Sequence, residues 1–271
     1  MLKMRVRRQI RRRVDWFPAK VYRHFDHPLC RSDAEVLVHN FNKNTSHSFL
    51  PLLTFQKKER RFRSGENGPV VSTKTRALAY SSNRDNCLYS YYASMLSDAY
   101  EGYIKASKID HVVLAYRTGG SNITHAAAAF EEIRSRGFCA AITFDITKFF
   151  DSIDHAVLKS NWSRVLGVTH LPEDHYKIFR SITAFATVEK SKCLERLGFH
   201  PRTADKDLPR PLCTIEDFRN KVRGDDGTCS NLVETNRKSF GIPQGTAISA
   251  LAANISMIGI DLELARISHR V

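Results

Sequence analysis

The stretch AITFDITKFFDSIDH, residues 141–155, places an acidic side chain where it could do chemistry. Apolar residues 138–144 lead directly into Asp145, and a short apolar run of this kind predicts a buried strand. A carboxylate at the end of a strand lies at a sheet edge, where its oxygens can hold a divalent cation. Pairs of such cations stabilise the attacking and leaving oxygens in phosphoryl transfer. The alternative is an aspartate that only shapes a turn or caps the next helix, which is the role we expect for Asp151 and Asp154.

A second stretch, FGIPQGTAISALAANISMIGID, begins at Phe240 and ends at Asp261. Its glycines permit close backbone approach, and Pro243 stiffens the turn between them. Gln244 could contact a sugar or a base, and the start of the following helix offers free N–H groups to a phosphate. The alternative is an ordinary loop before an ordinary helix.

Taken together and in this order, the two stretches resemble reverse transcriptases. FDITKFFDSIDH is similar to the motif A of that family, and GIPQGTAISALAAN is similar to its motif B. More loosely, KTRALAYSSNRDNCLYSYYASMLSDAYEGY resembles the fingers, and AYRTGGSNITHAAAAF resembles a family segment in which glycine is usual at the position of Ala115. The resemblance covers roughly residues 70–261 and is greatest to the bacterial antiviral, defence-associated members.

The resemblance implies roles for residues of both motifs. Asp145 would bind Mg²⁺ with the help of the backbone carbonyl of Ile146. Phe150 stands at the steric-gate position, where its ring would exclude a ribose 2′-hydroxyl and so favour deoxynucleotides. Gln244 would contact the incoming nucleotide, and Gly245 would give it clearance.

The resemblance also implies roles for basic residues. Lys74 and Arg76 would hold the triphosphate, unless they are merely solvated charges, and Arg117 would touch the template or the nucleotide. The net charge is +14, and residues 1–63 hold sixteen Lys and Arg against five Asp and Glu. We expect this block, with Arg11, Arg12 and Arg13, to grip nucleic acid through its phosphates. The alternative is a solvated basic arm without a dedicated partner.

One expected element is missing from the sequence. The family carries two adjacent aspartates on a short hairpin after motif B, and no such pair follows Asp261. The pair Asp225–Asp226 precedes motif B and predicts a surface turn. We expect the chain to be a fragment of a longer protein or a truncated reading frame with its C-terminal part encoded downstream. The alternative is a shortened descendant that binds RNA without synthesis.

Periodicity and capping signals predict the elements that must position these residues. A strand is expected at 76–80, and helices at 122–136 with Asn122 or Thr124 as N-cap, at 154–166, from Pro172 onward and at 248–262. Residues 190–239 are rich in Pro, Gly and Cys and give no clear prediction. Six scattered cysteines without metal-ligand spacing indicate free thiols in a reducing compartment, and no apolar run is long enough to span a membrane.

These observations lead to one overall prediction. We expect an α+β fold made of right-hand polymerase fingers and an incomplete palm, with an antiparallel palm sheet, packed helices and no thumb. The regions would be a basic N-terminal region (1–65), fingers (66–140) and a partial palm (141–271) with an insert at 190–239. The function would be RNA-directed DNA synthesis in the cytoplasm with Mg²⁺, dNTPs, a primer and an RNA template, for which a structured noncoding RNA is one candidate. A catalytically inactive RNA-binding protein is the alternative.

Overall fold

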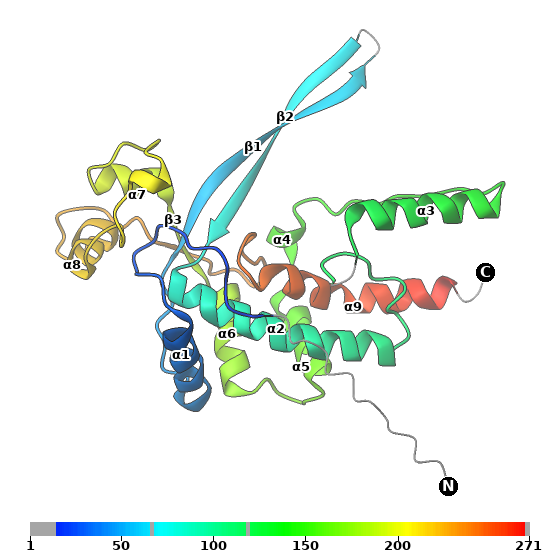
Figure 1. The fold of residues 1–271 in the computed structure, drawn as a ribbon, viewed down its shortest axis with the longest axis horizontal. Helices are drawn as coiled ribbons and strands as arrows, with labels where there is room; N and C mark the ends of the chain where they lie inside the picture. Colours follow the sequence, from blue (N-terminus) through cyan, green and yellow to red (C-terminus); the bar gives the residue numbers. More distant parts are fainter. Residues whose placement is uncertain (1–14, 66–67, 118–119, 269–271) are drawn as a thin grey trace.

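The computed structural model describes residues 15–65, 68–117 and 120–268 and shows a mixed α+β fold (Figure 1). Its helices are α1 (Arg31–Asn44), α2 (Asn83–Ala106), α3 (Asn122–Arg136), α4 (Phe149–Ser152), α5 (His155–Leu166), α6 (Glu173–Thr183), α7 (Lys190–Arg196), α8 (Ile215–Asp217) and α9 (Ser249–Ser268). A 3₁₀ turn, η1 (Asp205–Asp207), and a π-helical turn, η2 (Phe218–Arg223), accompany them. The strands are β1 (Leu52–Gly65), β2 (Gly68–Tyr80), β3 (Ala186–Glu189) and β4 (Glu234–Thr235).

The larger core is helical and is formed mainly by α2, α5, α6 and α9, which we call the helical core. Trp162 of α5, Tyr92 of α2 and Ile255 of α9 are completely buried in it. The predicted helices are confirmed, and α9 is buried along its N-terminal half as expected from its apolar spacing. The N-cap of α3 is Ser121 rather than Asn122 or Thr124, because its hydroxyl accepts from the backbone N–H of Thr124.

The sheet is small and mixed, with the strand order β2-β1-β3-β4. β1 runs antiparallel to β2 but parallel to β3, so an entirely antiparallel sheet is not what forms. A second core covers its base, where Leu53 and Val188 meet α7 and the residues around Leu212. Phe25 joins this core through a ring contact with Phe218 at 4.8 Å between centroids. The region 190–239, which gave no prediction, is therefore packed against Phe25 and the base of the sheet.

β1 and β2 form a long hairpin that projects from the body of the molecule (Figure 1). Pairing continues from Leu53↔Tyr80 to Gly65↔Gly68. The strand predicted at 76–80 is thus the last part of β2. The predicted boundary between residues 65 and 66 therefore lies between two strands that pair along their whole length.

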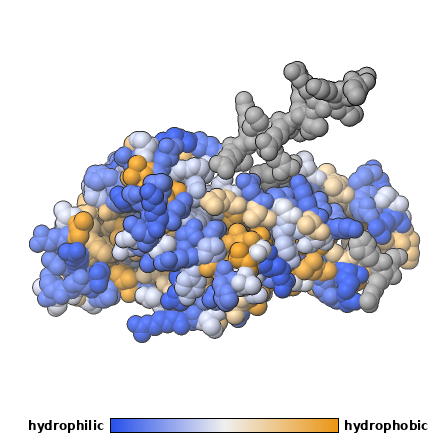
Figure 2. Space-filling model, turned by 90° about the horizontal axis from the view of Figure 1, so that it is seen from below, coloured by the Kyte–Doolittle hydropathy of each residue, from blue (hydrophilic) through white to orange (hydrophobic). Residues whose placement is uncertain are grey.

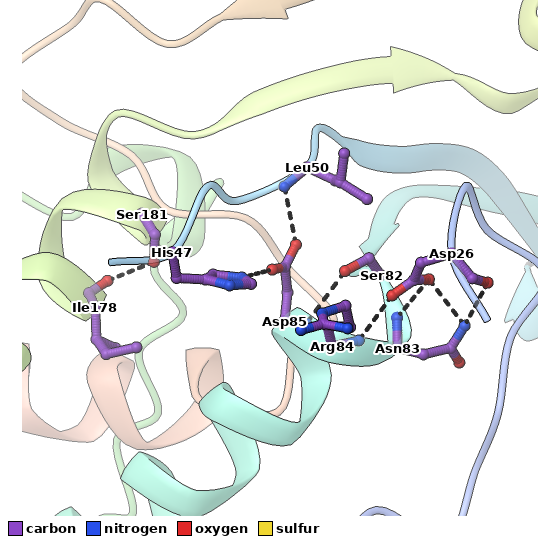
Figure 3. A network of polar contacts seen from close by, with 9 residues as sticks. All are labelled: Asp26, His47, Leu50, Ser82, Asn83, Arg84, Asp85, Ile178 and Ser181. Carbon is purple, nitrogen blue, oxygen red and sulfur yellow. Dashed lines mark hydrogen bonds and ion pairs between the residues drawn. The ribbon is translucent and has the colours of Figure 1, made fainter. Parts of the chain in front are cut away.

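A buried polar network fixes the point where β2 passes into α2 (Figure 3). Ser82 caps α2 by accepting from the backbone N–H of Asp85. The buried carboxylate of Asp85 accepts from the backbone N–H of Leu50 at 3.0 Å and lies 2.6 Å from Nε2 of His47. Burial raises the pKa of Asp85, and the hydrogen bond from His47 opposes that effect. This network sets the position of β2 relative to the helical core.

The strand predicted at 138–144 does not form. These residues are irregular and exposed, and Phe138, Ile142 and Phe144 are among the most exposed apolar side chains of the described residues. A strand needs a neighbour to satisfy its backbone groups, and no described strand lies alongside this segment. The apolar run alone was therefore not sufficient for strand formation.

On the face shown in Figure 2, apolar residues lie in several separate groups among hydrophilic ones. Among the described residues, no helix is both long enough and apolar enough to cross a lipid bilayer. The six cysteines are all free, as predicted.

Candidate nucleotide and nucleic-acid site

Two segments far apart in sequence meet through their backbones at the candidate site. The N–H of Ile242 donates to the carbonyl of Phe150 at 2.9 Å, and the N–H of Gly241 donates to the carbonyl of Ile153 at 2.8 Å. Next to them, Asp154 and Phe240 form an antiparallel bridge. The turn that follows Asp145 is therefore held directly against the loop that contains Gln244.

The same loop is also attached to the free edge of β2. The N–H of Ala79 donates to the carbonyl of Gln244 at 2.8 Å. At Gly245, whose φ is +121°, an added Cβ would lie 2.6 Å from the carbonyl oxygen of Ala79. In this structure the space left by the missing Cβ of Gly245 is taken by the backbone of β2, and clearance for a nucleotide there stays a prediction.

Gly241 explains the other close approach in this loop. Its φ is +89°, and a Cβ there would lie 3.1 Å from the carbonyl oxygen of Asp151. Both glycines are thus required by backbone contacts between separate segments. The loop, the turn at 148–155 and β2 form one junction, which we call the three-segment junction.

Phe150 and its neighbour Phe149 are half-buried beside this junction, with ring centroids 5.8 Å apart. Both pack against the helical core. Lys148, just before them, has φ of +53°, which is uncommon for a residue with a side chain. A strained residue held by its surroundings is typical of functional turns.

A pocket of about 700 Å³ opens at the junction. Lys148 and Lys238 bring positive charge to its lining, and Asp151 and Asp154 bring negative charge. Asp154 caps α5 by accepting from the N–H of Val157 at 2.9 Å, as predicted. The pocket is therefore open, polar and of mixed charge, which suits a ligand that carries both phosphate and hydrogen-bonding groups.

Asp145 and Ile146 lie in the exposed irregular segment that leads into the junction. Among residues 15–65, 68–117 and 120–268, no group of three or more His, Cys, Asp or Glu side chains could hold a metal ion. A two-cation centre needs several carboxylate oxygens. The described residues therefore do not by themselves fit such a centre, and the role of Asp145 as a metal ligand stays a prediction.

Lys74 and Arg76 lie on the same face of β2, further from the base of the hairpin than Ala79, which contacts Gln244. Arg76 forms an ion pair with Glu59, which also lies 3.0 Å from Lys57. Lys74 is exposed, and within the described part of the chain it has no ion pair. Of the two predicted phosphate ligands, Lys74 is thus the one whose charge is available to a ligand.

Arg117, for which a contact with the template or the nucleotide was predicted, is bonded within the protein. Its guanidinium donates to both carboxylate oxygens of Glu101, at 2.8 and 2.9 Å, and to the carbonyl of Val113 at 2.8 Å. The carboxylate raises the pKa of Arg117. This arginine fastens the loop after α2 to α2 itself and is not part of the three-segment junction. Arg11, Arg12 and Arg13 lie outside the described residues.

Several residues of the second stretch act in ways that sequence reasoning did not identify. Ser249 donates to the carbonyl of Pro243 at 2.5 Å and closes the loop before α9. Asn254 donates to the carbonyl of Ala115 at 2.8 Å, and Asn161 of α5 donates to the carbonyl of Ile255 at 3.0 Å. A polar residue inside an apolar helix is the signal that could have indicated such ties.

The turn predicted at Asp225–Asp226 is confirmed. Asp226 is exposed and accepts from the N–H and the hydroxyl of Thr228, at 3.0 and 2.8 Å. These hydrogen bonds lower the pKa of Asp226. The pair therefore belongs to a surface turn.

No family model matches this sequence, and a search of curated proteins finds no relative.

Proposed function

We propose that this chain forms the fingers and part of the palm of an RNA-directed DNA polymerase similar to bacterial antiviral reverse transcriptases. It would bind an RNA template, a primer and dNTPs, and it would take part in adding deoxynucleotides to a 3′-hydroxyl. The observation that carries the proposal is the three-segment junction. The two stretches that carry the resemblance lie in direct backbone contact there, and β2 with Lys74 and Arg76 is attached to the same loop.

The proposal gives each group at the junction a task. Lys74 attracts the triphosphate, and Phe150 limits the space available beside the sugar. Gln244 is half-buried, and its carbonyl is already engaged by Ala79, so its side chain is the part that would reach a nucleotide. Mg²⁺ and the role of Asp145 stay predictions, because one carboxylate does not hold two cations.

The test is primer extension with the protein expressed from its own locus, its flanking sequence retained. Asp145→Asn keeps the size of the side chain and removes its charge. We expect this variant to lose synthesis from an RNA template while its affinity for the template-primer changes less than twofold. The matched control is Asp98→Asn, which alters an exposed aspartate on α2 and should keep full activity. Unchanged synthesis in Asp145→Asn would contradict the catalytic role.

The steric gate has its own readout. Phe150→Ala opens the space beside the sugar, and we expect it to raise ribonucleotide incorporation relative to deoxynucleotide incorporation. An unchanged ratio would contradict the assignment of Phe150.

A second candidate function is RNA binding without synthesis. It is favoured by the exposed position of Asp145 and by the lack of a metal-binding group among the described residues. It predicts that Asp145→Asn keeps the full biological activity of the locus, so the same variant separates the two functions.

A further inference from the structure

A second pocket lies away from the three-segment junction, between the base of the hairpin and the region 190–239. Its volume is about 830 Å³. It opens where β3 ends, because β3 pairs with β1 only from Leu52 to Thr54 and leaves the edge of β1 free beyond that point. Its lining includes neutral hydrogen-bonding side chains from four separate segments, namely Thr54, Gln56, Thr187, Ser191, Thr203 and Asn231.

The charge in this pocket is close to balanced. Lys192 lies 3.0 Å from Glu189, and Lys190 forms an ion pair with Asp205. Arg202 also lines the pocket and, within the described residues, takes part in no ion pair, while Glu234 opposes it. A near-neutral pocket rich in hydroxyl and amide groups suits a base and a sugar better than an isolated phosphate.

The positive charge lies just above the pocket, on the hairpin. Residues directly opposite one another in an antiparallel pair share a face. Thr54 and the pair Gln56↔Ala77, which line the pocket, are therefore followed on the same face by Lys58↔Thr75 and Arg60↔Thr73. We call Lys58 and Arg60 the basic stripe.

The basic stripe is open to a ligand. Both side chains are exposed, and in the part of the chain that the structure describes neither has an acidic partner. Glu59, the one acidic residue of β1, points to the opposite face with Lys57 and Arg76. Side chains two residues apart on one face of a strand lie about 6.6 Å apart, which is comparable with successive phosphates of an extended polynucleotide.

We propose that the basic stripe and this pocket form a track for a single-stranded polynucleotide. The phosphates lie along Lys58 and Arg60, and one nucleotide enters the pocket between Gln56, Ala77 and Arg202. The track uses none of the residues to which the proposed function gives a task, namely Lys74, Asp145, Phe150 and Gln244, so it goes beyond the proposed function and can be tested without synthesis.

The first test is fluorescence anisotropy with labelled rU20, measured over a series of salt concentrations. Lys58→Glu with Arg60→Glu should weaken binding at least tenfold. It should also reduce the slope of log affinity against log salt by about 1.4, since each phosphate contact to a single strand contributes about 0.7. The matched control is Lys43→Glu with Lys177→Glu, which makes the same charge change at exposed positions on α1 and α6. Equal losses in the two double variants would overturn the track.

The pocket is tested separately from the stripe. Ala77→Phe fills the pocket with a residue that strands tolerate well, so the hairpin should keep its fold. We expect weaker binding of rU20 with an unchanged salt slope, because no charge is altered. Unchanged affinity would overturn the part of the proposal that places a nucleotide in the pocket.

Competition and crosslinking locate and identify the ligand. If unlabelled rU20 and dT20 compete equally well, the ligand is single-stranded nucleic acid of either kind. If rU20 competes more strongly, the ligand is RNA. Stronger competition by duplex than by either single strand would overturn the proposal. Crosslinks from 4-thiouridine RNA should map to peptides that contain residues 54–60 or 187–203, and crosslinks confined to other peptides would contradict it.

Discussion

The helical core and the segment 120–146 carry similar apolar content in sequence, yet they have opposite surroundings in the structure. In the helical core, Leu158, Trp162 and Ile255 are completely buried. In the segment 120–146, every residue is exposed apart from the half-buried His125. Apolar composition therefore indicates what a segment could bury, and the presence of packed neighbours decides whether it does so.

The two parts of that segment behave differently, and the reason is local. α3 forms because its reciprocal capping box and its alanine-rich body stabilise a helix without outside contacts. Residues 138–144 have no such local source of hydrogen bonds, so they stay irregular. A helix can form from its own residues, whereas a strand depends on a neighbour.

The largest expected difference between the two regions concerns a single aromatic side chain. Trp162→Ala removes a completely buried ring whose N–H donates to His175 at 3.3 Å. It should lower the free energy of unfolding by about 3–5 kcal/mol. Phe130→Ala on α3 removes an exposed ring and should change it by less than about 0.5 kcal/mol. Urea denaturation followed by circular dichroism measures both, and similar losses would show that α3 is packed in solution.

The next effect compares a buried histidine with an exposed one and depends on pH. Burial lowers the pKa of His24 to about 4, so the folded protein holds this imidazole neutral while the unfolded chain binds a proton near pH 6.5. Burying His24 in its neutral form therefore makes the free energy of unfolding depend on pH by roughly 3 kcal/mol. This stability is fully present above pH 6.5 and is lost as the pH falls towards 4. His24→Asn should flatten the decline in urea midpoint across this window. His170→Gln, which removes an exposed imidazole, should leave the decline unchanged.

The smallest effect concerns two glycines. Gly245→Ala places a methyl group against the carbonyl of Ala79 and should cost about 1–3 kcal/mol of unfolding free energy. At Gly102, inside α2 and about one turn before its C-terminal end, an added Cβ meets nothing within 4 Å, so Gly102→Ala should stabilise by about 0.5–1 kcal/mol. Hydrogen exchange at the N–H of Ala79 gives a local readout, and faster exchange in Gly245→Ala alone would confirm that this glycine holds β2 to the loop.

Local signals were sufficient for α3, α5, α6 and α9 and for the turn at Asp225–Asp226, because caps and periodicity act within a few residues. They failed for β1. Its run KKERR is typical of a solvated basic arm, and only the pairing with β2 makes it a strand. They also failed for region 190–239, whose core depends on Phe25 and Leu53 from distant parts of the chain. The two stretches of the resemblance meet through their backbones, Ile242 with Phe150 and Gly241 with Ile153, but the resemblance itself stays a prediction. It gave no sign that Arg117 pairs with Glu101.

The hairpin also has a mechanical consequence. Its base is tied to the loop at Gln244 on one edge and to β3 on the other, while eleven residues of each strand, 55–65 and 68–78, extend beyond these ties. At about 3.3 Å per residue this extension is roughly 36 Å long. A tilt of only about 10° at the base moves its far end by roughly 6 Å. A small rearrangement around Gln244 is thereby amplified into a displacement large enough to be followed by a pair of fluorescent labels.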